Sequence, residues 1–497
     1  MGCYSEVLAD LLLDLDSRDG ERVAYGRVNL MKRLTTERAS ASTIRPMLPP
    51  GPSTPAFVQT AQWMRSPAGT LEKLAARWGD AFTTRNALFG TMANFTHPDA
   101  LKEIFTGDPS VFHAGESNQV LGVFVGMQSV LLLDDAPHLH VRRLMLPAFH
   151  GERMRHYTVS MRDTTRRAIK ALRPGQRLGL HALFQHVTLE VILRAVLGLD
   201  DGSELEATRA QLLGILHRIQ SPSGLIWSMP ALRKDLGALT PWAGIKREIE
   251  ATDRLLLGYI DAHRKGAGDP DDVLSMLVGA VDENGKCLDD RALRDQLMTL
   301  LLAGHETSAT TLSWAFEELL RVPGEQERLI AEAEAVLGGA PVDTEHLPRI
   351  ERIDSVIKET LRLHPVIGAA GRRLKKPATV GGHELPAGVL VVGVMYLTHR
   401  RPELYPEPER FLGDRFIGKK IDPYEWAPFG GGIRRCLGMA FAMHEMKVIL
   451  ATMFGMGLRL ELEEQGPYET KLRNIIYAPK GETRVVVQGL GQGQALQ

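Results

Sequence analysis

Residues 429–438 read Phe-Gly-Gly-Gly-Ile-Arg-Arg-Cys-Leu-Gly, which places one cysteine, Cys436, shortly after three consecutive glycines. Glycine permits backbone conformations that other residues avoid, so such a loop can fold tightly against a flat ligand. The residues after Leu437 are mostly good helix formers, which predicts that Cys436 lies near the start of a helix. The helix dipole and the neighbouring Arg434 and Arg435 favour an anionic sulfur at that point. The segment therefore predicts a loop that presents a thiolate to a bound group.

Five positions of this loop match the pattern Phe-x-x-Gly-x-Arg-x-Cys-x-Gly: Phe429, Gly432, Arg434, Cys436 and Gly438. The segment resembles the signature of the cytochromes P-450, the haem-thiolate monooxygenases. The resemblance implies that Cys436 is the axial ligand of a haem b iron and that Phe429 and Arg434 lie beside the cofactor. A thiolate ligand pushes electron density toward the iron and favours cleavage of the O–O bond. The alternative is a structural cysteine beside a glycine turn, which is what most lone cysteines are.

The composition is that of an ordinary globular chain, with 497 residues, 44% hydrophobic residues, 24% charged residues and a net charge of -1. A net charge this close to zero gives no reason to expect nucleic-acid binding. Three cysteines far apart in the sequence, Cys3, Cys287 and Cys436, argue against a disulfide framework and favour a reducing cytoplasm. No run approaches the roughly 18 apolar residues of a membrane span, so we expect a soluble protein without a membrane anchor.

Three regions follow from the distribution of residue types along the chain. Residues 1–47 have mixed charge and no sustained period, and we expect a weakly ordered N-terminal extension; the alternative is that translation begins at Met31 or Met47. The proline-rich run that begins at Leu48 stops regular structure and, by the resemblance, opens the catalytic domain, residues 48–487. The last residues, 488–497, are expected to be a disordered tail.

Helical periodicity dominates from Thr70 onward, and strand signals are few. The segment 389–392 and the pair Thr379-Val380, which precedes Gly381-Gly382, together predict a hairpin. The fold class is therefore mainly α with small β-sheets. The resemblance implies the cytochrome P-450 fold, with a long central helix over the haem.

That central helix is predicted over the segment from Asp289 to Leu320, about 45 Å long at 1.5 Å per residue. Gly304 lies at its middle, and since glycine inside a helix costs about 1 kcal/mol against alanine, close approach of a flat ligand is one reason for it. Residues 303–308 read Ala-Gly-His-Glu-Thr-Ser and resemble the oxygen-binding helix of the family. The resemblance gives Glu306 and Thr307 the role of an acid–alcohol pair that relays protons to dioxygen. The alternative is that Thr307 only bonds a carbonyl one turn back.

Basic residues are needed near a buried haem because its two propionates carry negative charge, which arginine binds with paired hydrogen bonds. His138 and Arg142 fit the His-x-x-x-Arg pair of the family, on one helix face. Arg372, seven residues past Pro365, fits a further propionate contact, ahead of Arg373.

A structural triad is also implied by the resemblance. Glu359 and Arg362 share a helix face, and Arg415 comes from a later loop. In the family these three charges are buried together and hold the cysteine loop in place. Gly413 stands where that loop usually has a proline.

Three mainly apolar segments, 113–129, 366–370 and 475–477, are the expected substrate contacts, which favours a small apolar substrate such as a fatty acid, a terpenoid or a polyketide-like molecule. Electrons are expected from a ferredoxin with its ferredoxin reductase or from a flavodoxin-type donor, because the chain ends soon after the haem region. Arg434, Arg435 and Lys447 form a hypothetical basic face for an acidic ferredoxin.

The predicted reaction inserts one atom of O2 into a C–H bond or across a double bond and releases the other as water. Two alternatives keep the haem: a peroxide-driven haem-thiolate hydroxylase, and a haem-binding sensor or carrier without turnover. The acid–alcohol pair Glu306 and Thr307 argues against both. A third alternative, a helical scaffold without a cofactor, leaves the three glycines beside Cys436 unexplained.

Overall fold

The computed structural model describes residues 48–490 except 150, 152, 221–240, 465, 467, 468 and 474. The chain divides into two compact units, residues 1–47 and 48–497, and all that follows concerns the second. The predicted N-terminal extension and the last seven residues of the predicted tail lie outside the described residues.

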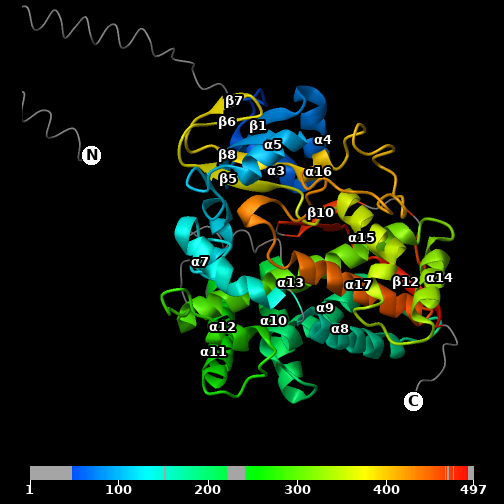
Figure 1. The fold of residues 1–497 in the computed structure, drawn as a ribbon. Coiled ribbons are helices and arrows are strands. Elements are labelled where there is room, and N and C mark those ends of the chain that lie inside the picture. Colours follow the sequence, from blue (N-terminus) through cyan, green and yellow to red (C-terminus); the bar gives the residue numbers. More distant parts are fainter. Residues whose placement is uncertain are drawn as a thin grey trace, which may run out of the picture. The chain divides into compact units, whose positions relative to one another are not determined.

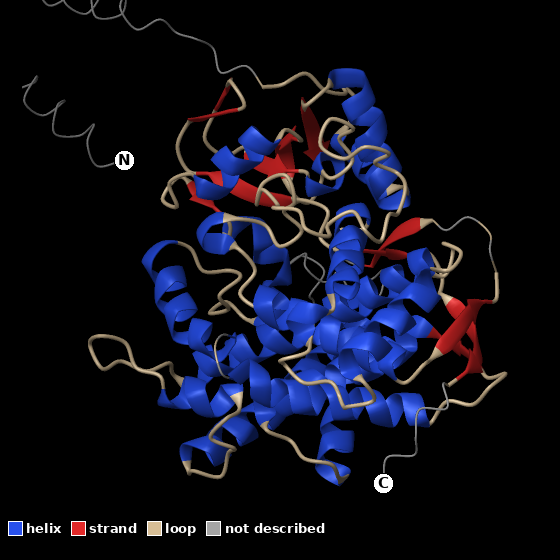
Figure 2. Cartoon of the chain, turned by 45° about the vertical axis from the view of Figure 1, so that its right-hand side comes forward, coloured by secondary structure: helices blue, strands red, loops and turns tan. Residues whose placement is uncertain are grey.

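Helices make up most of the described structure, and the strands collect on one side and at one edge (Figures 1 and 2). This confirms the predicted fold class. The helices are α3 (Ala56–Arg65), α4 (Pro67–Trp78), α5 (Pro98–Thr106), α6 (Gly122–Val125), α7 (Asp135–Met145), α8 (Arg153–Lys170), α9 (Leu180–Leu197), α10 (Ser203–Gln220), α11 (Pro241–Arg264), α12 (Val273–Gly279), α13 (Asp290–Leu319), α14 (Glu325–Leu337), α15 (Glu351–Leu363), α16 (Met395–Thr398) and α17 (Met439–Gly455).

The largest described sheet has the strand order β1-β2-β8-β5-β3. Strands β2 and β8 are parallel, and the other neighbouring pairs are antiparallel. The strands of this sheet are β1 (Ala81–Asn86), β2 (Gly90–Phe95), β8 (Leu390–Gly393), β5 (Ala370–Leu374) and β3 (Phe112–His113). Three smaller sheets consist of β6 (Ala378–Val380) with β7 (His383–Leu385), of β4 (Arg177–Gly179), β12 (Arg484–Gly489) and β9 (Arg459–Leu462), and of β10 (Thr470–Arg473) with β11 (Ile476–Pro479).

The central helix α13 has the position and length that the sequence predicts. Its N-terminus is capped by Asp289, whose Oδ1 accepts a hydrogen bond from the Ala292 amide at 2.7 Å. It ends at Leu319, four residues before Pro323. Helices α9, α15 and α17 all contact it, so α13 is buried over most of its length. A rigid core element thus carries residues 303–308.

Helix α9 forms much of the core beside α13. Among the described helices it alone is long and apolar enough to cross a membrane by length and composition, yet 72% of that window is buried in the fold. Such burial is the ordinary state of a core helix, since a membrane span would present its apolar side chains to lipid.

The predicted hairpin is wrong in one partner. Strand β6 turns back through Gly381 and Gly382, both with positive φ, and pairs with β7. Strand β8, which contains most of the apolar segment 389–392, lies instead between β2 and β5 in the large sheet. The expected start of the tail also differs, because β12 continues through Gly489.

Candidate active site

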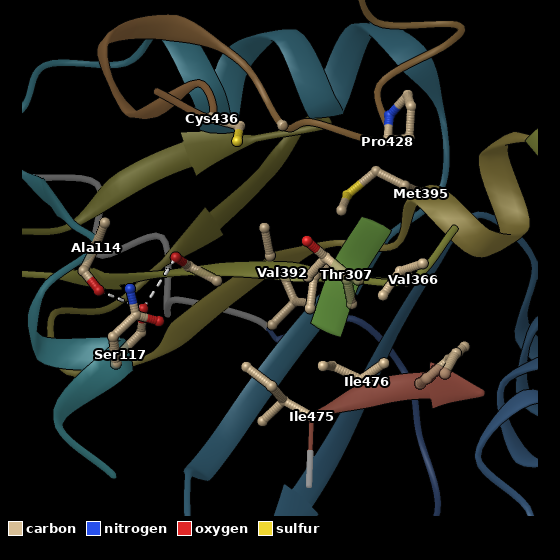
Figure 3. Close-up of a pocket in the computed structure, with 18 of the residues that line it drawn as sticks. Ala114, Ser117, Thr307, Val366, Val392, Met395, Pro428, Cys436, Ile475 and Ile476 are labelled. Carbon is tan, nitrogen blue, oxygen red and sulfur yellow. Dashed lines mark hydrogen bonds between the residues drawn. The ribbon is translucent and has the colours of Figure 1, made fainter. Parts of the chain in front are cut away.

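A cavity of about 1140 Å³ brings together segments that lie far apart in the sequence, and Figure 3 shows part of its lining. In this view the Thr307 side chain lies between Cys436 and the pair Ile475 and Ile476. All eight residues predicted to form the site line this one cavity: His138, Arg142, Glu306, Thr307, Arg372, Phe429, Arg434 and Cys436. The geometry therefore agrees with a common site for all of them.

The cysteine loop is shaped by its contacts with α5. Gly430 and Gly432 have φ of 65° and 62°, a region that favours glycine. A Cβ added at Gly432 would lie 1.8 Å from the carbonyl oxygen of Phe105. The loop is closed by the amide of Cys436, which donates to the carbonyl of Phe429 at 2.9 Å. At Gly432, close packing against the protein itself requires glycine, whereas the sequence reasoning invoked only a flat ligand.

The surroundings of Cys436 correct part of the electrostatic expectation. The Cys436 side chain is exposed to the cavity, yet desolvation by the protein that surrounds the cavity raises the pKa of its thiol, while the Gly438 amide and the charges of Arg142 and Arg435 oppose that rise without cancelling it. Arg434 does not take part in this balance. A bound metal cation deprotonates a coordinating thiol outright, so the thiolate depends on the iron rather than on the loop alone.

Arg434 is directed toward the segment before α7. Its Nη2 donates to Asp134 Oδ1 at 2.5 Å, and its Nη1 donates to the carbonyl of Val130 at 3.2 Å. Arg142, on α7, donates from Nη2 to the carbonyl of Arg435 at 2.8 Å. The two arginines thereby tie α7 and the residues before it to the cysteine loop.

Arg372 on β5 is the most deeply buried arginine of the site. It is 6% exposed and donates to the carbonyl of Gly371 at 2.8 Å, and no described carboxylate forms an ion pair with it. Burial and the charge of Arg434 lower its pKa to about 10. Arg373 points elsewhere and donates to the carbonyls of Gly388 and Phe89.

His138 completes a cluster of four basic side chains with Arg142, Arg372 and Arg434. Burial, followed by the charges of the three arginines, lowers its pKa to about 3, so the imidazole is neutral at pH 7. Its buried Nδ1 has no hydrogen-bond partner among the described residues. Buried polar atoms are rarely left in this state, and the cluster holds more positive charge than Asp134 balances. Both observations fit the two carboxylates of haem b.

On α13, Gly304 and Thr307 line the cavity together. The Thr307 Oγ1 donates to the carbonyl of Ala303 at 2.7 Å, so the bond named by the alternative interpretation is present. A Cβ added at Gly304 would lie 3.0 Å from Ile192 Cδ1 of α9. Close packing of α9 against α13 is therefore one reason for this glycine, beside its position in the cavity wall.

Glu306 is held on the side of α13 that faces α9 and β10. Gln185 Nε2 donates to its Oε2 at 2.7 Å, His181 Nε2 lies 3.3 Å from its Oε1, and Arg473 Nη1 lies 3.6 Å from its Oε1. Burial raises the pKa of Glu306, but His181 first, and then His305 and Gln185, lower it to about 2. The side chain is an anion at pH 7. Its oxygens contact side chains of α9 and β10 rather than the Thr307 hydroxyl.

The predicted structural triad is confirmed. Arg362 binds Glu359 through two hydrogen bonds of 2.7 and 2.9 Å, and Arg415 Nε donates to Glu359 Oε1 at 2.9 Å. Both arginines also donate to backbone carbonyls of the segment 399–410. Gly413 fits here because a Cβ would lie 2.1 Å from Glu325 Oε1. The triad thus fixes the chain that leads to the cysteine loop.

The three segments predicted for substrate contact all contribute to the cavity wall. Sequence reasoning missed the wall formed by α3, α4, β1 and β2, which is lined by Trp63, Leu71, Leu74, Trp78, Phe89 and Met92. The helical spacing of Leu71, Leu74 and Trp78 was the available signal, but it indicates an apolar face without saying what that face covers.

The hypothetical basic docking face is largely absent. Lys447 Nζ forms an ion pair with Asp354 Oδ1 at 2.5 Å, and Arg434 is directed inward. Of the three cations, Arg435 is the exposed one. Its neighbour Ile433 is 39% exposed, which gives the surface nearest Cys436 an apolar residue beside a single cation.

The Cys436 thiol and the Thr307 hydroxyl line one cavity with four basic side chains, which are the groups that a haem-thiolate protein needs. The chain belongs to the cytochrome P450 family, whose model matches residues 49–482. It is therefore a monooxygenase that uses haem b.

Among its relatives in Mycobacterium tuberculosis, cytochrome P450 135B1 is 39% identical over 446 residues, covering 89% of this chain and 91% of that one. Cytochrome P450 135A1 is 36% identical over 452 residues, with 88% and 95% covered. A solved structure of cyanobacterial CYP120A1 with bound retinoic acid matches with a TM-score of 0.75 and 23% identity, covering 88% of this chain and 99% of that chain.

Proposed function

We propose that this monooxygenase oxidises a small apolar organic molecule, such as a fatty acid or a terpenoid, in the cytoplasm, with electrons from a separate redox protein. The observation that carries the proposal is the common cavity lined by the eight site residues, whose wall also includes apolar side chains from the segments 113–129, 366–370 and 475–477 and from α3 and α4. Apolar pockets of this kind gain affinity by removing apolar surface from water.

Cys436 would bind the iron, while His138, Arg142, Arg372 and Arg434 would hold the two propionates and Phe429 would lie beside the ring. When bound, a haem with a thiolate ligand supplies the oxidation of the substrate by O2. The three arginines would neutralise the buried carboxylates, which is consistent with the positive charge that they carry beyond what Asp134 balances, and the neutral His138 would offer a hydrogen bond. Arg142 would also orient the cysteine loop through its bond to the Arg435 carbonyl.

Protons for the reaction would reach the cavity through Glu306 and Thr307. The Thr307 hydroxyl faces the cavity and can exchange its bond to the Ala303 carbonyl for one to a ligand. Glu306 would take up protons from the side of His181, which is 8% exposed and lies in hydrogen-bond reach. Because the pKa of Glu306 is about 2, the carboxylate would act as a transient carrier rather than as a stored proton.

The thiolate assignment is tested with Cys436→Ala and Thr307→Ala. The wild-type protein should give the red-shifted absorbance of the reduced carbon-monoxide complex, and Cys436→Ala should lose it. Thr307→Ala should keep that absorbance but release more hydrogen peroxide for each pair of electrons consumed, because proton delivery is impaired. Full coupling in Thr307→Ala would refute its relay role, and an unchanged spectrum in Cys436→Ala would refute the ligand assignment.

The electron donor would be a ferredoxin with its reductase or a flavodoxin-type protein that docks near Ile433 and Arg435. An exposed apolar residue beside a cation, both close to Cys436 in sequence, supports this site. Arg435→Glu should slow reduction of the haem by an acidic ferredoxin, most strongly at low salt, without changing substrate affinity. Lys447→Gln is the control, since Lys447 is engaged by Asp354. Equal reduction rates for Arg435→Glu and the wild type would dismiss the site.

A further inference from the structure

His113, the last residue of β3, lies beside the site without lining the cavity. It is 9% exposed, and the residue after it, Ala114, does line the cavity. The Ser117 hydroxyl donates to the Ala114 carbonyl at 2.6 Å (Figure 3). Strand β3 pairs with β5, which carries Arg372. The imidazole therefore adjoins the cavity wall near the proposed propionate contacts.

Three carboxylates surround the His113 ring. Its Nδ1 lies 3.3 Å from Glu116 Oε1 and 3.5 Å from Asp134 Oδ2, and its Nε2 lies 3.4 Å from Asp135 Oδ2. Arg373, opposite His113 on β5, is directed to backbone carbonyls instead. An ionised carboxylate only accepts hydrogen bonds, and a neutral imidazole has a single N–H, so only the imidazolium form can donate from both nitrogens. The neutral form would turn a nitrogen lone pair toward an anion.

The charges of this group balance when His113 is protonated. Lys375 Nζ lies 2.6 Å from Glu116 Oε1, and Arg434 Nη2 lies 2.5 Å from Asp134 Oδ1. These two cations meet three acids, and the imidazolium supplies the third positive charge. Loss of its proton would leave excess negative charge beside Arg434, one of the side chains proposed to bind a propionate.

Asp134 joins this group to the proposed haem contacts. Its carboxylate accepts from the two amides of the segment 115–116, at 2.8 and 3.1 Å, and from Arg434, which lines the cavity. The next residue, Asp135, begins α7 with φ of 51°, a region that residues other than glycine seldom adopt. Such a conformation persists where neighbouring groups hold it, and His113 contacts the Asp135 carboxylate. Loss of that contact would therefore loosen the first turn of α7.

We infer that His113 is a positioning residue for the haem, whose imidazolium form holds Asp134 and the first turn of α7 in place. Through them it orients Arg434, His138 and Arg142, so the inference rests on the propionate contacts of the proposed function. Histidine is the side chain whose charge ordinarily changes between about pH 5 and pH 8. Above that range the excess negative charge would repel the propionates, and α7 would lose a contact at its start. The protein should therefore release haem faster at alkaline pH.

The test measures the rate at which haem passes from the protein to excess apomyoglobin, at about pH 6 and at about pH 9. The wild type should release haem about tenfold faster at the higher pH, as expected for the loss of one charge-assisted hydrogen bond. His113→Gln, which carries no charge, should release haem rapidly at both pH values, with less than about twofold between them. His113→Lys, which keeps a positive charge, should release it slowly at both. His140→Gln is the matched control and should keep the wild-type profile, because His140 also lies on α7 but does not line the cavity.

A wild type that releases haem equally fast at both pH values would overturn the inference, as would a His113→Gln protein whose rate still rises by the wild-type factor. If His113→Gln does not fold, His113→Lys decides, because a rise by the wild-type factor in that variant would equally overturn it. Failure of the proposed function is distinct, since it would appear as a wild-type protein without the reduced carbon-monoxide spectrum of a haem thiolate.

Discussion

Glu445, on α17, is a carboxylic acid that the fold keeps away from water. Its side chain is fully buried, and neither oxygen has a hydrogen-bond partner among the described residues. Burial raises its pKa to about 8, and the nearby Ser308 hydroxyl of α13 only partly opposes that rise. The group is therefore neutral at pH 7, in contrast to Glu306, which neighbouring donors keep ionised. Glu306, which is part of α13, and Glu445, on the neighbouring α17, therefore have opposite protonation states at pH 7.

The raised pKa of Glu445 makes stability depend on pH. In the unfolded chain this carboxyl loses its proton near pH 4.5, whereas in the folded protein it keeps the proton to about pH 8. Its contribution to the free energy of unfolding should therefore fall by about 1.4 kcal/mol per pH unit across that window and level off above it. Glu445→Gln should remove this component, so its advantage over the wild type grows from pH 5 to pH 8 in denaturant unfolding. A difference independent of pH would contradict the argument.

At the scale of elements, the contact between the cysteine loop and α5 is the most demanding in the site. Gly432 has a positive φ, and the carbonyl oxygen of Phe105 lies where the Cβ of any other residue would be. Gly285 has φ of 74° and nothing within 4 Å of an added Cβ. A substitution at Gly285 therefore introduces backbone strain without a steric clash. The pair allows the two effects to be measured separately.

Gly285→Ala should cost about 1 kcal/mol of unfolding free energy, because only the left-handed backbone is strained. Gly432→Ala should cost roughly 2–5 kcal/mol, since the loop must also move away from Phe105. The same movement displaces Cys436, so the variant should bind less haem per protein at equal expression. The ratio of haem absorbance to protein concentration measures this, and a Gly432→Ala protein with full haem content would refute the proposed rigidity.

Sequence reasoning found the elements whose signals are local. The cap at Asp289, the proline after α13 and the glycines before Cys436 each act within a few residues, and the structure has these elements where they were predicted. It failed where the decisive contact is distant. One of the two partners of β8 is β2, about 300 positions earlier in the chain, and the raised pKa of Cys436 comes from desolvation by the surrounding protein.

At the scale of the whole described unit, haem is expected to complete the core and so to stabilise the folded state. Three arginines that repel one another, Arg142, Arg372 and Arg434, meet beside the neutral His138 in α7, β5 and the cysteine loop, and a dianion would relieve that repulsion. Anything that binds only the folded state also stabilises it. Helix α9 packs mainly on α13, α10 mainly on α11, and α8 mainly on α17 and α9, so these three helices should depend less on the cofactor than the basic cluster does.

Removal of haem should therefore loosen the molecule unevenly. Amide hydrogen exchange should accelerate about tenfold or more in α7, β5 and residues 429–438, and change little in α8 and α9. Mass spectrometry of haem-loaded and haem-free protein, with peptides from both groups, measures the contrast. A uniform acceleration over all peptides would show that the cofactor supports the entire unit instead.

The cavity wall takes residues from Pro52 near one end of the described chain and from Tyr477 near the other. During translation the earlier segments emerge first, but the cavity wall is incomplete until the cysteine loop and β11 have left the ribosome. Haem added to a nascent chain should therefore be captured only at the close of synthesis, and a message truncated before codon 429 should yield colourless protein however much haem the cell contains.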